Sequence, residues 1–184
     1  GDTDMDSHLD LPWVHKSRSE LAMCEWIPFQ RAIQTHTEVV MTAHVMFPKL
    51  DSEFPATMSK VILQDLLRTE FQYSGVIVSD DMEMKAVRGR FPVQEQMDRA
   101  VRAGVDAFLV CSDAALQMEC VEALVKLQEQ DAEHEALADR SLRRLHHLQL
   151  RRQELNSINP MIGIPEEWHQ LCSEINQRTE FAAG

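Results

Sequence analysis

The chain is poor in positive charge. Its 184 residues include 18 lysines and arginines against 30 aspartates and glutamates, which gives a formal net charge of −12. A protein that binds nucleic acid or an anionic membrane surface is expected to carry a basic footprint. We therefore expect no nucleic-acid partner and no membrane partner.

Long hydrophobic runs and cysteine motifs are also missing. No apolar run approaches the roughly 18–20 residues that span a bilayer, and no signal peptide is visible. The four cysteines form no C-x-x-C pair, so the sequence indicates neither a zinc site nor a disulfide framework. We predict reduced thiols, with Cys24 and Cys111 buried in apolar surroundings, and a cytoplasmic location.

The motifs of common cofactor and nucleophile sites are absent as well. The sequence contains no G-x-G-x-x-G, no G-x-x-x-x-G-K-[ST], no H-E-x-x-H and no G-x-S-x-G. We expect no cofactor and no metal ion. With 44% hydrophobic residues, the chain can nevertheless form a packed core.

Short apolar runs alternate with helical patterns along the chain. Residues 38–43, 75–79 and 107–111 are typical of strands, and the last two are apolar enough to be covered on both faces. Such strands, separated by helices, predict βα units and a parallel sheet. The predicted helices cover residues 17–34 with a break at Pro28, a segment capped by Thr57 or Ser59, and residues 93–103, 114–128, 132–155 and 166–178.

The number of strands limits the choice of fold. A closed (β/α)8 barrel needs eight strands and typically about 250 residues. Because the chain also begins abruptly, at Gly1 rather than Met, we predict an α/β fold that is the C-terminal part of a (β/α)8 TIM-type barrel, with the N-terminal half missing. A small, open, doubly wound sheet is the alternative. We assign residues 1–156 to the barrel domain and residues 157–184 to a linker and a short C-terminal helix.

Asp80 is the first candidate for chemistry. It directly follows the apolar run Val76–Ser79, and the C-terminal ends of strands carry the active site in parallel α/β folds. A carboxylate in that place can act as a nucleophile. Alternatively, Asp80 or Asp81 only caps the helix that follows. Two adjacent acids would allow one to cap while the other faces the cleft.

Histidines supply the second candidate group. In Asp6-Ser7-His8, Asp6 can accept a hydrogen bond from the imidazole, which fixes its tautomer and makes His8 a competent general acid. The simpler interpretation is a polar loop with an incidental histidine. His44 ends another predicted strand, and it either lines the cleft and binds substrate or is a satisfied core histidine.

The remaining histidines and the arginines near the C-terminus lie on helical patterns. We interpret them as the solvated faces of amphipathic helices. These residues are His134, His146, His147, His169, Arg140, Arg143, Arg144, Arg151 and Arg152.

Several segments resemble motifs of glycoside hydrolase family three, in its β-N-acetylglucosaminidase branch. Residues 1–12 are similar to the end of the family's K-H-F-P-G-H-G-D-T-x-x-D-S-H-x-x-L-P signature, and residues 40–45 to its V-M-T-A-H-V strand. Residues 54–59 resemble F-P-A-T/S-L-S, residues 75–86 resemble G-V-I-x-S-D-D-L-x-M-x-A, and residues 100–110 resemble A-V-x-A-G-x-D-x-L-L-V. The motifs follow one another in the family's order.

The resemblance implies a (β/α)8-type barrel and a retaining mechanism at terminal β-linked N-acetylglucosamine. By position, Asp80 corresponds to the nucleophile, His8 to the acid/base, and Asp6 to its partner on a mobile loop. A His–Asp dyad would thus replace the acid carboxyl of the usual two-carboxylate plan. The implied partner is a carbohydrate substrate, an N-acetylglucosaminide such as a muropeptide of cell-wall recycling.

The chain departs from the family pattern at its beginning. The K-H pair expected before Gly1 is absent, as are the upstream Asp and Arg residues that hold the sugar, so we expect the 184-residue piece alone to have no useful activity. Met82 replaces a leucine, which conserves volume. Two other functions stay open. One is a β-glucosidase-type member of the family, which does not need residues 6–8; the other is a non-catalytic remnant or interaction module that docks a partner through helix 132–155.

Overall fold

Three short strands form a parallel sheet in the order β1-β2-β3. The computed structural model describes residues 11–158 of the chain, with side chains up to residue 155. Both neighbouring pairs are parallel, with Val39 opposite Val76 and Val78 opposite Ala107. The strands are β1 (Val39–Met41), β2 (Val76–Asp81) and β3 (Ala107–Leu109). The predicted α/β class and parallel pairing are confirmed.

The chain divides into two compact units, residues 1–148 and residues 149–184. The first unit contains the sheet. The described part of the second is the end of helix α5 (Ala132–Ile158), whose residues 149–155 are exposed. Among the described helices, none combines the length and the apolar character needed to cross a membrane. The predicted helix over residues 166–178 lies outside the described residues.

Within the described residues, two helices precede the sheet, α1 (Arg18–Met23) and α2 (Trp26–Gln34). Ser17 and Glu20 form a capping box at the start of α1, in which the Ser17 amide donates to Glu20 Oε2 at 2.6 Å. Pro28 lies in the first turn of α2, where a missing amide hydrogen costs nothing. The predicted break at Pro28 is therefore wrong in position: the helical segment is interrupted between Met23 and Trp26, and Pro28 lies within α2.

Helices also connect the strands. After β1 come the short turn η1 (Ala56–Met58) and the π-helix η2 (Val61–Glu70); α3 (Val93–Ala103) follows β2 and α4 (Ala114–Gln130) follows β3. Ser59 Oγ accepts the Ile62 amide at 3.2 Å at the start of η2. Asp113 Oδ1 accepts the Ala115 amide at 3.0 Å at the start of α4. Gly104 ends α3 with a φ of 106°, a left-handed conformation that glycine adopts without strain.

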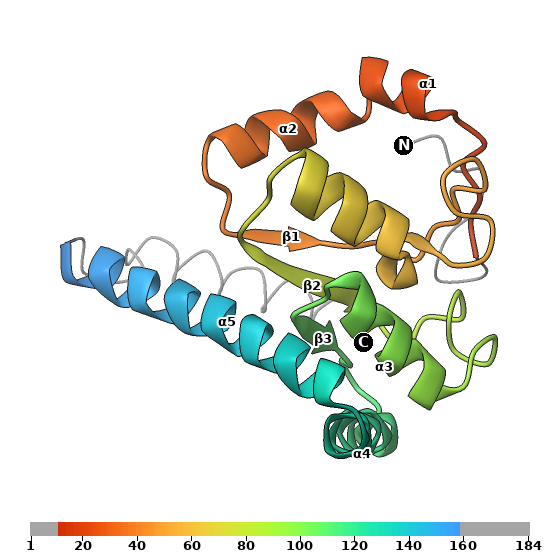
Figure 1. The fold of residues 1–184 in the computed structure, drawn as a ribbon, viewed down its shortest axis with the longest axis vertical. Helices are drawn as coiled ribbons and strands as arrows, with labels where there is room; N and C mark the ends of the chain where they lie inside the picture. Colours follow the sequence, from red (N-terminus) through yellow and green to blue (C-terminus); the bar gives the residue numbers. More distant parts are fainter. Residues whose placement is uncertain (1–10, 159–184) are drawn as a thin grey trace, which may run out of the picture. The chain divides into compact units, whose positions relative to one another are not determined.

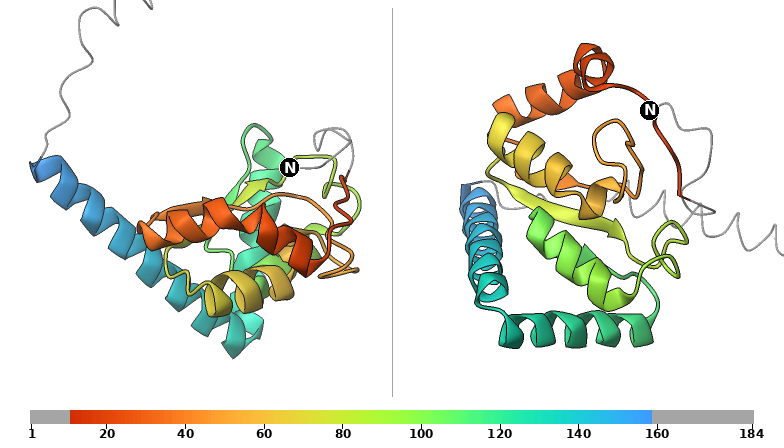
Figure 2. Two further views of the ribbon diagram at one scale, coloured as in Figure 1. Left: turned by 90° about the horizontal axis from the view of Figure 1, so that it is seen from above. Right: turned by 45° about the vertical axis from the view of Figure 1, so that its right-hand side comes forward.

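Both crossover connections step along the sheet in the same direction. Because such connections are right-handed, the helices η2 and α3 cover the same face of the sheet, where they lie side by side (Figures 1 and 2). A doubly wound sheet would reverse direction between units. The described strands contain no such reversal, so they do not support the doubly wound alternative.

The hydrophobic core lies between these helices and the sheet. Ile77 of β2 and Met97 and Ala100 of α3 are fully buried, and all belong to one cluster. The continuous apolar run of β2 and the 3–4 residue spacing in α3 are typical of elements that bury such side chains. The sequence pattern therefore predicts this part of the core correctly.

A buried carboxylate, Asp106, holds the opposite end of the sheet from Asp80. Its Oδ2 accepts the Ile77 amide at 2.8 Å and Arg68 Nη2 at 2.7 Å. Its Oδ1 accepts Ser141 Oγ and Arg144 Nη1 of α5, each at 2.8 Å. The Asp106 side chain is fully buried. Its hydrogen bonds join β2, η2 and α5 to the start of β3.

Some side chains lie where the sequence does not predict them. Cys24 and Cys111 are exposed rather than buried, although both are free thiols, as expected. His134 is only 3% exposed, and Arg144 pairs with Asp106 instead of facing solvent. The corrections at His134 and Arg144 share one cause: the helical pattern identifies the apolar side of α5 but not the polar partners that other elements bring to it.

Candidate active site at the end of the middle strand

A β-bulge distorts β2 at the candidate nucleophile. Val78 lies opposite Ala107 and Asp81 opposite Leu109, so β2 has two residues, Ser79 and Asp80, where β3 has one. Bulges of this kind change the direction of a side chain and are frequent beside active sites. Ser79 Oγ accepts the Leu109 amide at 3.0 Å and so replaces a ladder hydrogen bond that the bulge removes.

Asp80 stands at the C-terminal end of the middle strand of the described sheet. Its side chain is half-buried, and its Oδ1 accepts the Asp81 amide at 2.8 Å. Asp81 Oδ1 accepts the Glu83 amide at 3.1 Å. The second acid therefore caps the turn after the strand. The other oxygen of the first acid, Asp80 Oδ2, makes no bond to a described residue at this edge.

Glu83 holds the end of β3 beside this strand end. Its Oε2 accepts Ser112 Oγ at 2.6 Å, and its Oε1 accepts the Asp113 amide at 2.8 Å. The Ser112 hydroxyl and the backbone amides of Asp113 and Ser112 lower the pKa of Glu83 below its usual value. Glu83 thus links the loop after β2 to the start of α4 as an ionised carboxylate. This role could not be predicted from the sequence, because Ser112 is remote along the chain.

His44 is completely buried, three residues beyond the end of β1. Its Nε2 lies 3.1 Å from the Asp81 carbonyl oxygen, and its Nδ1 lies 3.0 Å from Thr57 Oγ1. Thr57 Oγ1 is in turn 2.8 Å from Thr42 Oγ1. Burial lowers the pKa of His44, against the opposing effects of the Asp81 carbonyl and the Asp80 and Asp81 carboxylates.

The segment that follows the predicted acid/base is anchored at the same edge of the sheet. Leu11 is buried in a small cluster with Met46, which follows His44, and Ala86, which follows β2. The Val14 amide donates to the Met46 carbonyl at 2.8 Å, and the Met46 amide donates to the Pro12 carbonyl at 2.9 Å. Asp6 and His8 themselves lie outside the described residues.

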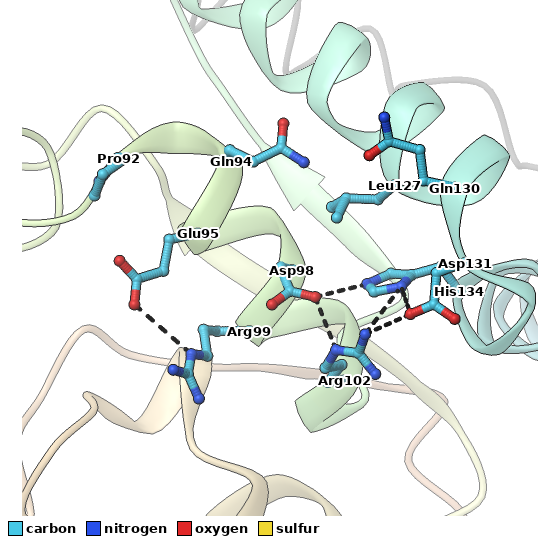
Figure 3. Close-up of a pocket in the computed structure, with 10 residues that line it drawn as sticks. All are labelled: Pro92, Gln94, Glu95, Asp98, Arg99, Arg102, Leu127, Gln130, Asp131 and His134. Carbon is cyan, nitrogen blue, oxygen red and sulfur yellow. Dashed lines mark hydrogen bonds and ion pairs between the residues drawn. The ribbon is translucent and has the colours of Figure 1, made fainter.

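A separate hollow of about 530 Å³ lies on the outer side of α3 (Figure 3). It is lined by polar side chains of α3 and of the junction between α4 and α5. Asp98, Arg102 and His134 converge in it, which makes it the other cluster of titratable groups that requires an explanation. The lining residues are Pro92, Gln94, Glu95, Asp98, Arg99, Arg102, Leu127, Gln130, Asp131 and His134.

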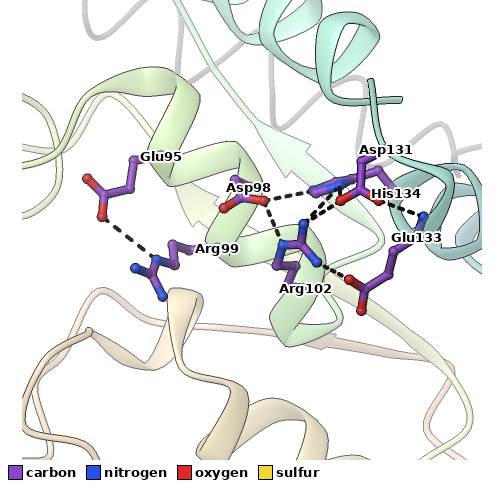
Figure 4. A network of polar contacts seen from close by, with 7 residues as sticks. All are labelled: Glu95, Asp98, Arg99, Arg102, Asp131, Glu133 and His134. Atoms are coloured by element: carbon purple, nitrogen blue, oxygen red, sulfur yellow. Dashed lines mark hydrogen bonds and ion pairs between the residues drawn. The ribbon is translucent and has the colours of Figure 1, made fainter. Parts of the chain in front are cut away.

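Ion pairs occupy the charged groups of this hollow (Figure 4). Arg102 donates to Asp98 at 2.8 Å and to Asp131 at 2.6 Å, and it also pairs with Glu133. His134 Nδ1 lies 3.0 Å from Asp131 Oδ2 and Nε2 lies 2.9 Å from Asp98 Oδ1. The Glu133 amide, His134 and Arg102 lower the pKa of Asp131 to about 2. We interpret the cluster as a clasp between α3 and the start of α5. Within residues 11–158, no group of acidic, histidine or cysteine side chains is suited to a metal ion.

Comparison with known proteins identifies the family. The family model described as "Glycosyl hydrolase family 3 N terminal domain" matches residues 1–148, which include the whole sheet and Asp80. The chain belongs to glycosyl hydrolase family 3. The resemblance found in the sequence motifs is therefore confirmed.

The family 3 chain is similar to several curated and solved proteins. It is 39% identical to a beta-hexosaminidase of Hydrogenovibrio crunogenus over 108 residues, 59% of this chain and 30% of the relative. It is 33% identical to a beta-hexosaminidase of Thiobacillus denitrificans over 141 residues, 77% of this chain and 37% of the relative. It matches a family 3 beta-N-acetylglucosaminidase of Paenibacillus sp. str. FPU-7 with a TM-score of 0.79 and 40% identity, over 83% of this chain and 29% of that one. The chain thus spans about a third of the length of these relatives.

The thiol of Cys111 offers a test of the electrostatics at this edge. A hydrogen bond to Asp81, partial desolvation and the charges of Asp81, Glu83 and Asp80 raise the pKa of Cys111. A raised pKa leaves less thiolate at a given pH, so alkylation is slow. We expect Asp81→Asn to lower that pKa and, because more thiolate is then present, to speed alkylation by iodoacetamide at pH 8 by roughly three- to tenfold.

Cys24 is the internal control, because it is also exposed but lies in the turn between α1 and α2. Its alkylation rate should be the same in both proteins when the two labelled peptides are quantified by mass spectrometry. An unchanged rate at Cys111 in the variant would show that Asp81 does not control this thiol.

Proposed function

We propose that this chain carries the nucleophile and the acid/base of a retaining glycoside hydrolase that removes terminal β-linked N-acetylglucosamine. The chain supplies the C-terminal part of a (β/α)8 barrel, consistent with its singly wound parallel sheet. Similarity to beta-hexosaminidases and to a beta-N-acetylglucosaminidase supports the sugar specificity. A muropeptide of cell-wall recycling is the substrate we favour, with the reaction in the cytoplasm.

One observation supports this proposal above the others. The bulged end of β2 that holds Asp80 and the segment that follows His8 are anchored at the same edge of the sheet, since Leu11 packs with Ala86 and Met46. Two residues lie between His8 and Leu11, and the three steps from His8 to Leu11 span at most about 11 Å. A short loop can therefore bring the imidazole to a sugar bound over Asp80.

The reaction proceeds by double displacement. The Asp80 carboxylate attacks the anomeric carbon, the bond to the leaving oxygen breaks, and His8, as the imidazolium, donates its proton to that oxygen. Asp6 accepts a hydrogen bond from the imidazole and orients it. Water then attacks the anomeric carbon of the glycosyl-enzyme, His8 takes the proton of that water, and the Asp80 carboxylate leaves.

Replacing His8 tests the acid/base assignment. In the protein as its gene encodes it, we expect His8→Ala to reduce kcat/KM by about 10²–10⁴-fold for a substrate with a poor leaving group. The loss should be much smaller for a dinitrophenyl glycoside, because that leaving group needs no proton. Hydrolysis rates across a series of aryl β-N-acetylglucosaminides measure the difference.

His15 provides the matched control, because it is a histidine downstream of the same loop and the proposal gives it no role. His15→Ala should retain parental rates across the series. An equal loss for all leaving groups in His8→Ala would contradict the assignment of His8 as the proton donor.

A further inference from the structure

The end of β2 is held by side chains as well as by backbone pairing, since the Met82 amide donates to the Leu109 carbonyl at 2.9 Å. On the β3 side, Ser79 Oγ accepts the Leu109 amide at 3.0 Å. On the β1 side, the last backbone rung joins the Thr42 amide to the Val78 carbonyl at 2.9 Å. Beyond this rung β1 has ended, and the His44 ring reaches the Asp81 carbonyl in its place.

The two partners of His44 define its tautomer. A carbonyl oxygen only accepts, so Nε2 must carry the proton that it donates to Asp81. In the neutral ring Nδ1 then accepts, and the Thr57 hydroxyl donates to it. Since the Thr57 proton is used there, Thr42 donates its own hydroxyl proton to Thr57 Oγ1. The chain of bonds thus runs in one direction, from Thr42 to Asp81.

We propose that His44 is a positioning residue, held as the Nε2–H tautomer by Thr57, which fixes the strand end that carries the Asp80 nucleophile. The inference rests on the proposed function of Asp80. Asp80 Oδ1 accepts the Asp81 amide, and His44 holds the carbonyl of that same Asp81. The orientation of the carboxylate is therefore coupled to a backbone segment that His44 immobilises.

This role differs from binding of substrate by His44. The ring is completely buried, and both of its nitrogens are bonded to described residues. Burial also lowers the pKa of His44, which keeps the ring neutral although the Asp80 and Asp81 carboxylates favour the charged form. A neutral ring with no free nitrogen can orient the strand end but has no group to offer a sugar.

Two isosteric substitutions separate positioning from simple stability. Thr57→Val removes the hydrogen that Nδ1 accepts, whereas Thr42→Val removes only the donor to Thr57 and leaves the Thr57 hydroxyl free to bond His44. Both threonines are buried, at 0% and 7% exposure, so thermal unfolding of each variant is needed to separate lost stability from lost positioning. Only the first should remove the hydrogen bond that holds Nδ1 of His44.

We expect Thr57→Val to lower kcat by about 10–100-fold, as loss of an orienting outer contact does in other sites, with KM changed less than about twofold. Thr57→Ser should restore the rate, and Thr42→Val should stay near the parental value. The assay is hydrolysis of an aryl β-N-acetylglucosaminide by the protein as its gene encodes it, with thermal unfolding measured beside it. Equal kcat values in Thr57→Val and Thr42→Val would overturn the proposal.

A second measurement does not depend on activity. Nitrogen-15 NMR of the imidazole should find His44 neutral and protonated at Nε2 in the parent and in both valine variants, because the Asp81 carbonyl still accepts from Nε2. The Nδ1 resonance should show the loss of its hydrogen bond in Thr57→Val and not in Thr42→Val. A proton on Nδ1 in the parent would overturn the proposal, whatever the protein hydrolyses. If the parent hydrolyses no glycoside while the ring shows the Nε2–H form, the proposed function fails and the assignment of the His44 tautomer stands.

Discussion

Asp80→Ala is expected to reduce hydrolysis of an aryl β-N-acetylglucosaminide by about 10⁴-fold or more, because removal of the nucleophile of a covalent mechanism leaves only binding and the remaining groups. Azide should restore part of the rate. It is small enough to enter the space of the lost carboxylate, and its attack on the anomeric carbon yields an α-glycosyl azide, with one inversion instead of two.

Asp81→Asn is the matched control for this experiment. Asp81 is also an acid at the end of β2, but its carboxylate caps the Glu83 amide. An asparagine keeps that acceptor, so this variant should retain most of the activity and gain nothing from azide. A loss of activity in Asp81→Asn as large as that in Asp80→Ala, with rescue by azide, would show that Asp80 is not the nucleophile and that Asp81 is.

Asp106→Asn should produce the largest loss of stability of any conservative change considered. The substitution leaves the Arg68 guanidinium, which is only 6% exposed, without its charged partner, and it weakens the bonds to Ser141 and Arg144. Breaking a buried ion pair from one side costs about 3–5 kcal/mol. Urea unfolding followed by circular dichroism measures the change in the free energy of unfolding.

The exposed pair of Arg88 and Asp113 provides the comparison. Its atoms are also 2.7 Å apart, but the side chains are 52% and 27% exposed. Arg88→Gln should therefore cost less than about 1 kcal/mol. If the two variants unfold at the same urea concentration, the network around Asp106 does not hold the sheet to α5 as described above.

The parts of the fold that the sequence predicts are those set by local chemistry. The apolar run before Ser79 predicts the middle strand, and Gly104 predicts the end of α3, because each signal acts within a few residues. Asp113, which caps α4 by accepting the Ala115 and Leu116 amides, is likewise a signal that acts within a few residues. For the same reason, the residues around Asp80 are sufficient to predict that it lies at a strand end.

The details of the site depend on partners that are distant along the chain. The bulge at Ser79 and Asp80 appears only when β2 is paired with β3. The burial of His44 depends on a carbonyl 37 residues away. The sequence does contain one signal for these contacts, because polar residues such as Thr42 and Ser79 stand at the ends of apolar runs. Their position indicates that each has a hydrogen-bond partner but does not identify that partner.

The most direct test of the central claim is covalent trapping of the nucleophile. The protein as its gene encodes it is incubated with an activated fluorinated N-acetylglucosaminide analogue that forms the glycosyl-enzyme faster than it is hydrolysed, and the digested protein is mapped by mass spectrometry. We expect one sugar attached to the carboxylate of Asp80, and no label in Asp80→Ala. A sugar on Asp81 or Glu83, or labelling that persists in Asp80→Ala, would contradict it.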